Sequence, residues 1–172
     1  NGFLLGSDSL GRDVASGIVH GAKTSLLIGF VATLVSVFIG IFFGAFAGYF
    51  GGIIDDILMR VTEIFQTIPS FIFAILLVAI MKPSMSSIVI AIAVVSWPGV
   101  ARLVRGEFLA VKNREFVQAC HTLGMSDFRI MLREILPNCL SPIIVVGSLM
   151  VATAILIESG LAFLGLGDPN IM

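Results

Sequence analysis

The side chains best suited to acid–base or metal chemistry are four carboxylates and both histidines of the sequence. They are His20, Asp55, Asp56, Glu63, His121 and Glu158. The paired aspartates, followed by Arg60, could bind a divalent cation beside a phosphate group, but a closed coordination shell would need further acidic residues nearby. The histidines are isolated, and Cys120 and Cys139 form no CxxC pair. The spacing therefore indicates no catalytic residue, no metal site and no bound cofactor.

The composition indicates what kind of protein must position these side chains. Of the 172 residues, 58% are hydrophobic and 12% are charged, and the mean hydropathy is +1.09. Soluble domains have a smaller apolar share, about 45–50%. The sequence therefore predicts an integral membrane protein. Its net charge of −1 offers no basic excess for binding nucleic acid.

Four apolar stretches are long enough to cross a bilayer as helices, because about 20 residues span the hydrocarbon core. They cover residues 25–50, 57–81, 88–104 and 141–164. Residues 1–23 are polar and rich in glycine, which predicts a segment outside the membrane without a long regular element. Residues 51–56 should form a turn, Pro69 should kink the second span, and Pro98 should break the third. The fold class we predict is an all-α integral membrane protein, a polytopic helical bundle.

Glycines form a regular pattern within the first span. Gly40, Gly44 and Gly48 recur at every fourth residue. Small residues at this spacing let the backbone of another helix approach closely. The pattern favours helix packing within the bundle, and lining of a solute pathway is the alternative.

Basic residues are distributed unevenly between the connections of these spans. One side of the membrane would carry Arg60, Arg102, Arg105, Lys112, Arg114, Arg129 and Arg133, and the other side Arg12, Lys23 and Lys82. The positive-inside rule therefore places residues 101–140 in the cytoplasm. In this topology the candidates for chemistry divide between the two sides, with His20 and Glu158 opposite the other four. An intramembrane enzyme, our second hypothesis, would thus lack a common active site.

Glu158 is an acid deep in an apolar stretch. Counting from Ser141 at about 1.5 Å per residue places it roughly 25 Å along the last span, near the outer boundary of the membrane. A charged residue in a span often belongs to a pathway or gate. A glutamate at the outer interface, bonded to a neighbouring helix, is the structural alternative. Both interpretations remain open at this point.

Residues 115–136 lie in the longest interval without a membrane-like apolar run. Apolar residues recur there at spacings of three and four, namely Phe116, Ala119, Cys120 and Leu123, then Phe128, Met131, Leu132 and Ile135. Gly124 should end the first helix in a left-handed cap, Ser126 or Asp127 should cap the second, and Pro137 should stop it. The pattern predicts a pair of short amphipathic helices. Its nearly balanced charge argues against a DNA-binding helix-turn-helix.

The same segment carries a sequence motif. Glu115-x-x-Gln118-Ala119-Cys120-x-x-x-Gly124, followed by Leu136-Pro137, resembles the "EAA" cytoplasmic loop of binding-protein-dependent ABC importer permeases. Residues 5–13 with 21–26, and residues 161–169, are similar to the dipeptide, oligopeptide and nickel permeases of that family. Gln118, Cys120 and Glu134 depart from the broad pattern, and all three lie within the helix pair.

The resemblance implies a single permease domain over residues 1–172, with 101–140 as its cytoplasmic EAA-type loop and one helix missing at each end. The residues it implies for docking an ATP-binding ABC subunit are Glu115, Phe116, Gln118, Ala119, Cys120, Leu123 and Gly124. The other implied partners are a second homologous permease subunit, an extracytoplasmic solute-binding protein and membrane lipid. The implied location is the cytoplasmic (inner) membrane of a prokaryote.

The resemblance also implies transport by alternating access, with the cytoplasmic helix pair as the coupling element. ATP hydrolysis is expected in a separate subunit, because the sequence contains no G-x-x-x-x-G-K-[ST] motif for binding nucleotide. The matching segments do not separate peptide permeases from nickel permeases. We expect a di- or oligopeptide as the solute, with nickel or another small solute as the alternative.

Overall fold

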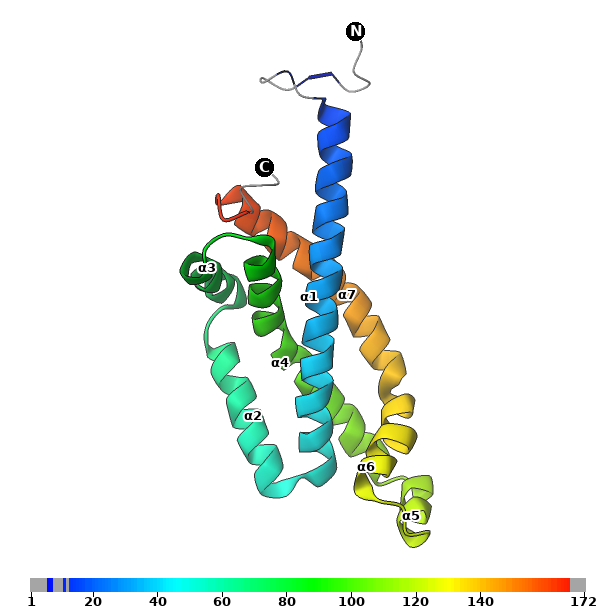
Figure 1. Cartoon of the computed structure of the whole chain (residues 1–172). Coiled ribbons are helices and arrows are strands. Elements are labelled where there is room, and N and C mark those ends of the chain that lie inside the picture. The colour runs from blue at the N-terminus through cyan, green and yellow to red at the C-terminus, as the bar shows by residue number, and fades with distance from the viewer. Residues whose placement is uncertain (1–5, 8–10, 12, 168–172) are drawn as a thin grey trace.

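The computed structural model describes residues 6–7, 11 and 13–167 of the chain. The described residues form an all-α bundle, which confirms the predicted fold class (Figure 1). Its elements are α1 (Val14–Phe50), α2 (Gly52–Thr67), α3 (Ser70–Met81), α4 (Met85–Lys112), α5 (Glu115–Thr122), α6 (Asp127–Arg129), the π-helix η1 (Ile130–Ile135) and α7 (Leu136–Phe163). Parts of the motif segments 5–13 and 161–169 lie outside the described residues.

Three helices of the described chain are long and apolar enough to cross a membrane: α1, α4 and the continuous helix Asp127–Phe163. The pair α2 and α3 passes the same test only as one broken span, because the two helices meet at 83°. The bend falls at Pro69, which has no N–H to donate and forces the preceding Ile68 into an extended conformation. The predicted interruption is present, but it is much sharper than a kink within one span.

Helix α1 begins well before the span predicted for it. Asp13 caps its start by accepting a hydrogen bond from the backbone N–H of Ala15 at 3.1 Å. Residues 14–23, predicted to lack a long regular element, are therefore helical. Gly17 and Gly21 each cost about 1 kcal/mol relative to alanine, which is too little to break a capped helix. The 37 residues of α1 rise about 55 Å, more than the roughly 30 Å of the bilayer core.

Helix α1 packs along α4 through the glycine ridge. A Cβ atom at Gly44 would lie 2.4 Å from the carbonyl oxygen of Ala101, and one at Gly48 would lie 2.6 Å from the Cβ of Phe108. Gly40 approaches α4 equally closely one turn earlier. Only glycine lets two helix backbones come this near. The ridge therefore faces a helix of the same chain.

Helix α4 continues through Pro98, where the sequence predicted a break. A proline inside a helix removes one backbone hydrogen bond. The carbonyl that loses its usual partner is that of Val94, four residues earlier. Helix α1 packs against α4 on both sides of the proline, because the Phe43 ring contacts the Trp97 ring and Gly40 lies against Val100. The predicted break was wrong because this packing holds α4 together at Pro98.

The second helix of the predicted pair does not stop at Pro137. It continues from α6 through η1 into α7 as one helix, Asp127–Phe163. The wider π turn lets the N–H of Leu136 bond to the carbonyl of Met131, and the side chain of Asn138 donates to the carbonyl of Glu134 at 2.6 Å. Carbonyls near Pro137 thus find donors despite its missing N–H, and the predicted stop was wrong.

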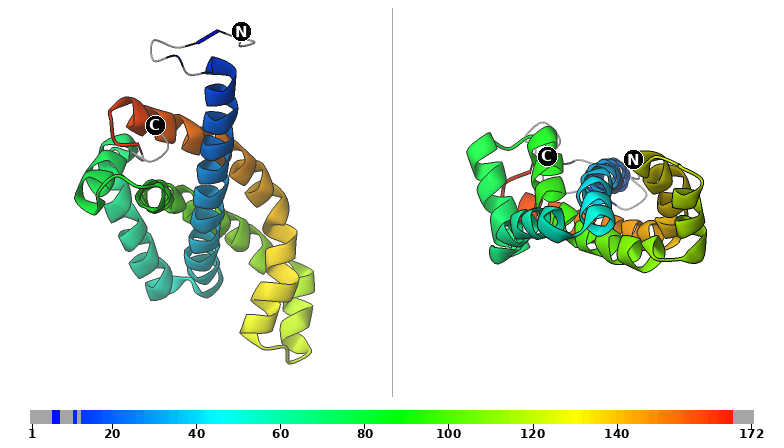
Figure 2. Two further views of the ribbon diagram at one scale, coloured as in Figure 1. Left: turned by 45° about the horizontal axis from the view of Figure 1, so that its top comes forward. Right: turned by 90° about the horizontal axis from the view of Figure 1, so that it is seen from below.

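The connections between helices gather at two ends of the bundle (Figure 1). The turn between α1 and α2 lies at the same end as α5 and α6, whereas the α3–α4 connection lies at the other end. This grouping agrees with the alternation of the four predicted spans. Asp55 and Asp56, expected in the turn, belong to α2 instead, because the chain reverses at Gly51 with φ +66°. Seen from below, α1 stands between the α2–α3 side and the α5–α6 side (Figure 2).

Candidate functional site

Val117 holds helix α5 against the bundle. It is fully buried and belongs to an apolar cluster that we call the inner cluster. Other members, from α4, η1 and α7, are Phe108, Val111, Ile130, Met131, Ile135 and Cys139. Val117 is not among the residues predicted from the sequence, because the predicted apolar face of this helix runs through Phe116. The spacing of three between Val117 and Cys120 was the signal of a second face, since both pack towards this cluster.

The opposite face of α5 is exposed. Phe116, Ala119 and Leu123 lie at the surface, and Leu123 is 80% exposed. The other expected docking residues at the surface are Glu115, Gln118 and Gly124. Cys120 differs from them, because it is half-buried and packs against the inner cluster. A group of solvent-exposed apolar side chains on one helix is typical of a surface that contacts another protein.

The turn after α5 has the left-handed residue that the sequence predicted. Gly124 has φ +76°. Its N–H bonds to the carbonyl of His121 at 3.0 Å, and the N–H of Met125 bonds to the carbonyl of Cys120 at 3.1 Å. These are the two hydrogen bonds of a Schellman motif. Met125 then packs against the inner cluster, so the turn is held by backbone bonds and by a side chain.

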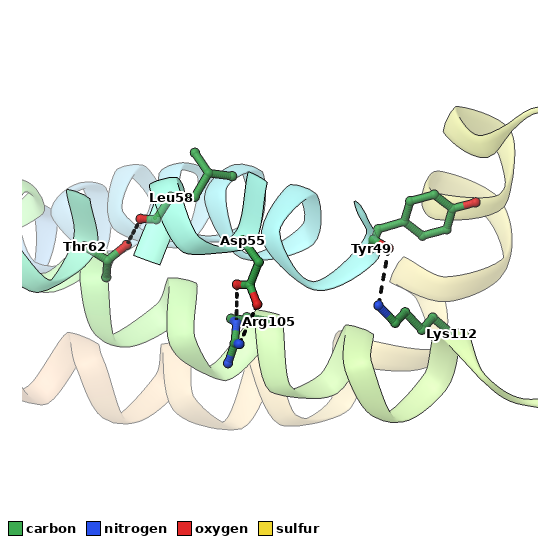
Figure 3. Close-up of polar contacts among 6 residues, drawn as sticks. All are labelled: Tyr49, Asp55, Leu58, Thr62, Arg105 and Lys112. Atoms are coloured by element: carbon green, nitrogen blue, oxygen red, sulfur yellow. Dashed lines mark hydrogen bonds and ion pairs between the residues drawn. The ribbon is translucent and has the colours of Figure 1, made fainter. Parts of the chain in front are cut away.

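The segment after this turn is bonded to the end of α1. The hydroxyl of Tyr49 donates to Asp127 Oδ1 at 2.7 Å and lies 3.4 Å from His121 Nε2. At the end of α4, Lys112 Nζ donates to the backbone carbonyl of Tyr49 at 3.4 Å (Figure 3). Ser126 occupies the N-cap position of α6 without a side-chain capping bond. The carboxylate of Asp127, which was expected to cap this helix, instead binds the tyrosine.

An ion pair ties α2 to α4 at the same end of the bundle. Both carboxylate oxygens of Asp55 accept hydrogen bonds from the guanidinium of Arg105 (Figure 3). An open pocket of about 270 Å³ lies beside this pair, and its charged lining residues are Asp55, Asp56, Arg60, Glu63, Arg102 and Arg105. Asp55 is thus engaged by an arginine. Among the described residues, no three His, Cys, Asp or Glu side chains are placed to hold a metal ion.

The remaining candidates for chemistry lie far from this end. Glu158 is 8% exposed and accepts a hydrogen bond from Ser25 Oγ at 2.8 Å, which joins α7 to α1. This is the kind of contact that the structural alternative for Glu158 expects. His20 Nδ1 lies 2.9 Å from the carbonyl oxygen of Ser16, and His20 is about 43 Å from Tyr49 along α1. The structure therefore does not bring the six residues of the enzyme hypothesis together.

Several known sequences that are similar to this chain are permease proteins of transport systems. The dipeptide transport system permease protein DppC of Bacillus subtilis (strain 168) is 45% identical over 163 residues, which are 95% of this chain and 51% of that protein. The oligopeptide transport system permease protein OppC of Escherichia coli (strain K12) is 45% identical over 170 residues, 99% of this chain and 56% of that protein. The chain spans about half the length of the curated relatives that it matches.

The fold is similar to that of a solved transporter. A structure titled as inward-facing conformations of the MetNI methionine ABC transporter superposes with a TM-score of 0.76, over 88% of this chain and 76% of that chain. At 18% identity, this likeness supports the fold alone. Residues 40–171 match the sequence model of a family described as binding-protein-dependent transport system inner membrane component. Because this match covers most of the sequence, the chain belongs to that family and is a multi-pass membrane protein.

Proposed function

We propose that the chain is part of a permease subunit of an ATP-driven importer. The observation that carries this proposal is the exposed face of α5, with Phe116, Ala119 and Leu123, held firmly by Val117 and by the Gly124 turn. A short helix with a small residue between two larger apolar ones suits a groove on another protein. The protein expected to provide this groove is an ATP-binding ABC subunit. Helix α5 and the start of the following helix form the cytoplasmic coupling element of the permease.

The proposed mechanism is alternating access. Hydrolysis of ATP takes place in the partner subunit, since the sequence has no nucleotide-binding motif of its own. Movement of the docked α5 rocks the membrane helices, so that the pathway opens to one side at a time. A second homologous permease subunit completes the pathway, and an extracytoplasmic binding protein delivers the solute. At the outer end, Glu158, which accepts a hydrogen bond from Ser25, is the candidate gate residue.

The proposed solute is a di- or oligopeptide. The relatives described above are named for dipeptide and oligopeptide transport. A third relative, from Pseudomonas aeruginosa (strain UCBPP-PA14), is a di/tripeptide permease that is 42% identical over 165 residues, 96% of this chain and 54% of that protein. These names favour a peptide over nickel, the alternative that the motifs left open.

Copurification and uptake test this function directly. The full-length protein, tagged and extracted in mild detergent with its transport partners, is expected to retain an ATPase that a peptide-loaded binding protein stimulates. Proteoliposomes containing the complex should take up a radiolabelled dipeptide only when ATP is supplied. Uptake of nickel without uptake of peptide would replace the proposed solute, and the absence of any associated ATPase would overturn the proposed function.

Cysteine labelling tests the orientation of the chain. In a Cys120→Ser background, Asn113→Cys should react with an impermeant thiol reagent only from the cytoplasmic side, because Asn113 is exposed beside α5 whereas Cys139 is buried. The matched control is Ser86→Cys, exposed at the opposite end of α4, which should react only from outside. Labelling of Asn113→Cys in intact cells would contradict the topology predicted by the positive-inside rule.

A further inference from the structure

The end of α1 and the start of α6 are joined by a hydrogen bond between residues far apart in the sequence. The hydroxyl of Tyr49 and Asp127 Oδ1 are 2.7 Å apart, close to the length of a charge-assisted bond between a hydroxyl and a carboxylate. The Tyr49 ring also stacks on the His121 ring, with centroids 6.4 Å apart and planes at 25°. In Figure 3 the Tyr49 side chain extends away from Lys112 towards the pale yellow ribbon.

Tyr49 is held firmly on the side of α1. The residue before it, Gly48, lies directly against Arg105 and Phe108 of α4. The backbone carbonyl of Tyr49 accepts a hydrogen bond from Lys112 at 3.4 Å. The position of the hydroxyl is therefore set by the contact between α1 and α4, the two helices that the glycine ridge joins.

Asp127 is held equally firmly on the side of α5. It follows the Schellman turn at Gly124 by three residues and begins the helix that continues through η1 into α7. Ile130, one turn later, is fully buried in the inner cluster together with Val117. A displacement of α5 must therefore move Asp127 as well.

An open cavity lies between the end of α1 and the segment of α5 and α6. Its volume is about 490 Å³, and it is lined by Tyr49, Phe50, Lys112, Asn113, Gln118, His121 and Asp127. Beside the cavity, Phe46 and Tyr49 of α1 pack against the inner cluster that also holds Val117. Across the open part itself apolar packing transmits little force, because a gap of about 1 Å already removes about half of the van der Waals attraction. There the polar contact of Tyr49 with Asp127 and His121 joins the two sides.

We propose that Tyr49 is a positioning residue that transmits the movement of α5 to α1. The inference rests on the proposed function, in which α5 is the docking helix of an ATP-driven importer. When the partner subunit pulls α5, Asp127 pulls the tyrosine, and α1 moves with it and carries α4 along the glycine ridge. Loss of the hydroxyl leaves the outer face of α5 intact, so docking persists while the transmission to α1 weakens.

The test separates docking from coupling. Tyr49→Phe removes the donor hydroxyl, and Asp127→Ala removes the carboxylate that accepts its hydrogen bond. Each variant is made in the full-length protein, assembled in proteoliposomes with its ATPase subunits, second permease subunit and binding protein. The quantities measured are the amount of ATPase subunit retained, the rate of ATP hydrolysis, and the uptake of radiolabelled alanyl-alanine per ATP hydrolysed.

Both variants should retain the ATPase subunits at the unaltered level, while uptake per ATP falls about fivefold or more, the lower end of typical coupling between sites. The double variant should lose no more than the worse single variant, because both changes remove the same bond. The matched control is Thr153→Val in α7, which removes a hydroxyl that bonds within its own helix, to the carbonyl of Leu149 at 3.3 Å. Its uptake per ATP should be unchanged.

Two results would overturn the inference. One is unchanged uptake per ATP in both single variants, and the other is loss of the ATPase subunits, which would make Tyr49 part of docking. If Tyr49→Phe is poorly folded, as judged by its elution profile in detergent, Asp127→Ala alone decides between these outcomes. Failure of the proposed function itself looks different, because the unaltered complex would then show neither an associated ATPase nor ATP-dependent dipeptide uptake.

Discussion

Replacing Gly44 with alanine is expected to destabilise the purified protein by about 3 kcal/mol or more. The new Cβ atom would lie 2.4 Å from the carbonyl oxygen of Ala101 and 2.7 Å from the Cβ of Val104. Overpacking a core costs about 1–3 kcal/mol where side chains can adjust. Here the obstacle is backbone and Cβ, so α1 and α4 must move apart along their contact. The midpoint of thermal unfolding in mild detergent should fall by about 6 °C or more.

The matched control for this prediction is a glycine of the partner helix. A Cβ atom at Gly106 of α4 meets no heavy atom within 4 Å, so Gly106→Ala should keep or slightly raise the unfolding midpoint, since alanine favours helix over glycine by about 1 kcal/mol. Gly17→Ala in α1, also without a close neighbour, should behave the same way. Equal midpoints for Gly44→Ala and Gly106→Ala would mean that the two helices do not meet along the ridge.

The sequence predicted the backbone conformation correctly where a single residue determines it. Gly124 has the left-handed conformation that its place after an amphipathic segment predicted, and the chain bends at Pro69, where a kink was predicted, although by 83°. The glycine spacing of the first span likewise indicated a close helix contact, although it could not tell which helix would lie there. These features depend on sterics within a few residues, and such sterics are visible in any sequence.

The proline signals failed where the structure around the proline outweighs its local preference. Pro98 does not break α4 because α1 packs against α4 on both sides of the proline, through Phe43 with Trp97 and Gly40 with Val100. Pro137 does not stop its helix because a π turn and the side chain of Asn138 satisfy the neighbouring carbonyls. In both cases the local propensity is weaker than the tertiary or helical context that surrounds it.

The residues of the candidate site also differ in whether the local sequence could predict them. The exposed residues of α5 followed from a short motif and its helical spacing. The bond between Tyr49 and Asp127 joins residues 78 positions apart, and nothing in either local sequence marks one as the partner of the other. Val117 lies between these cases, because its periodic spacing was present in the sequence but was hidden by a second apolar face on the same short helix.

Placing arginine at position 119 is expected to separate the permease from its ATPase subunits. Ala119 is exposed on the face of α5 that also carries Phe116 and Leu123. If this face enters a groove, a long charged side chain must be buried there without a partner, at a cost of about 3–5 kcal/mol. A cost of about 3 kcal/mol weakens binding roughly 100-fold. The ATPase subunit should therefore be lost on purification, and ATP-dependent uptake of peptide should fall to background.

The same substitution should leave the fold of the chain unaffected. Val117, on the opposite face of α5, keeps its place in the inner cluster, so the amount of Ala119→Arg in the membrane and its unfolding midpoint should match those of the unaltered protein. The matched control is Ala22→Arg, an exposed alanine beside Lys23 near the start of α1, which should retain the ATPase subunits. Should Ala119→Arg keep both the ATPase and peptide uptake, α5 would not be the docking helix. The coupling role of Tyr49, which depends on docking at α5, would then fall with it.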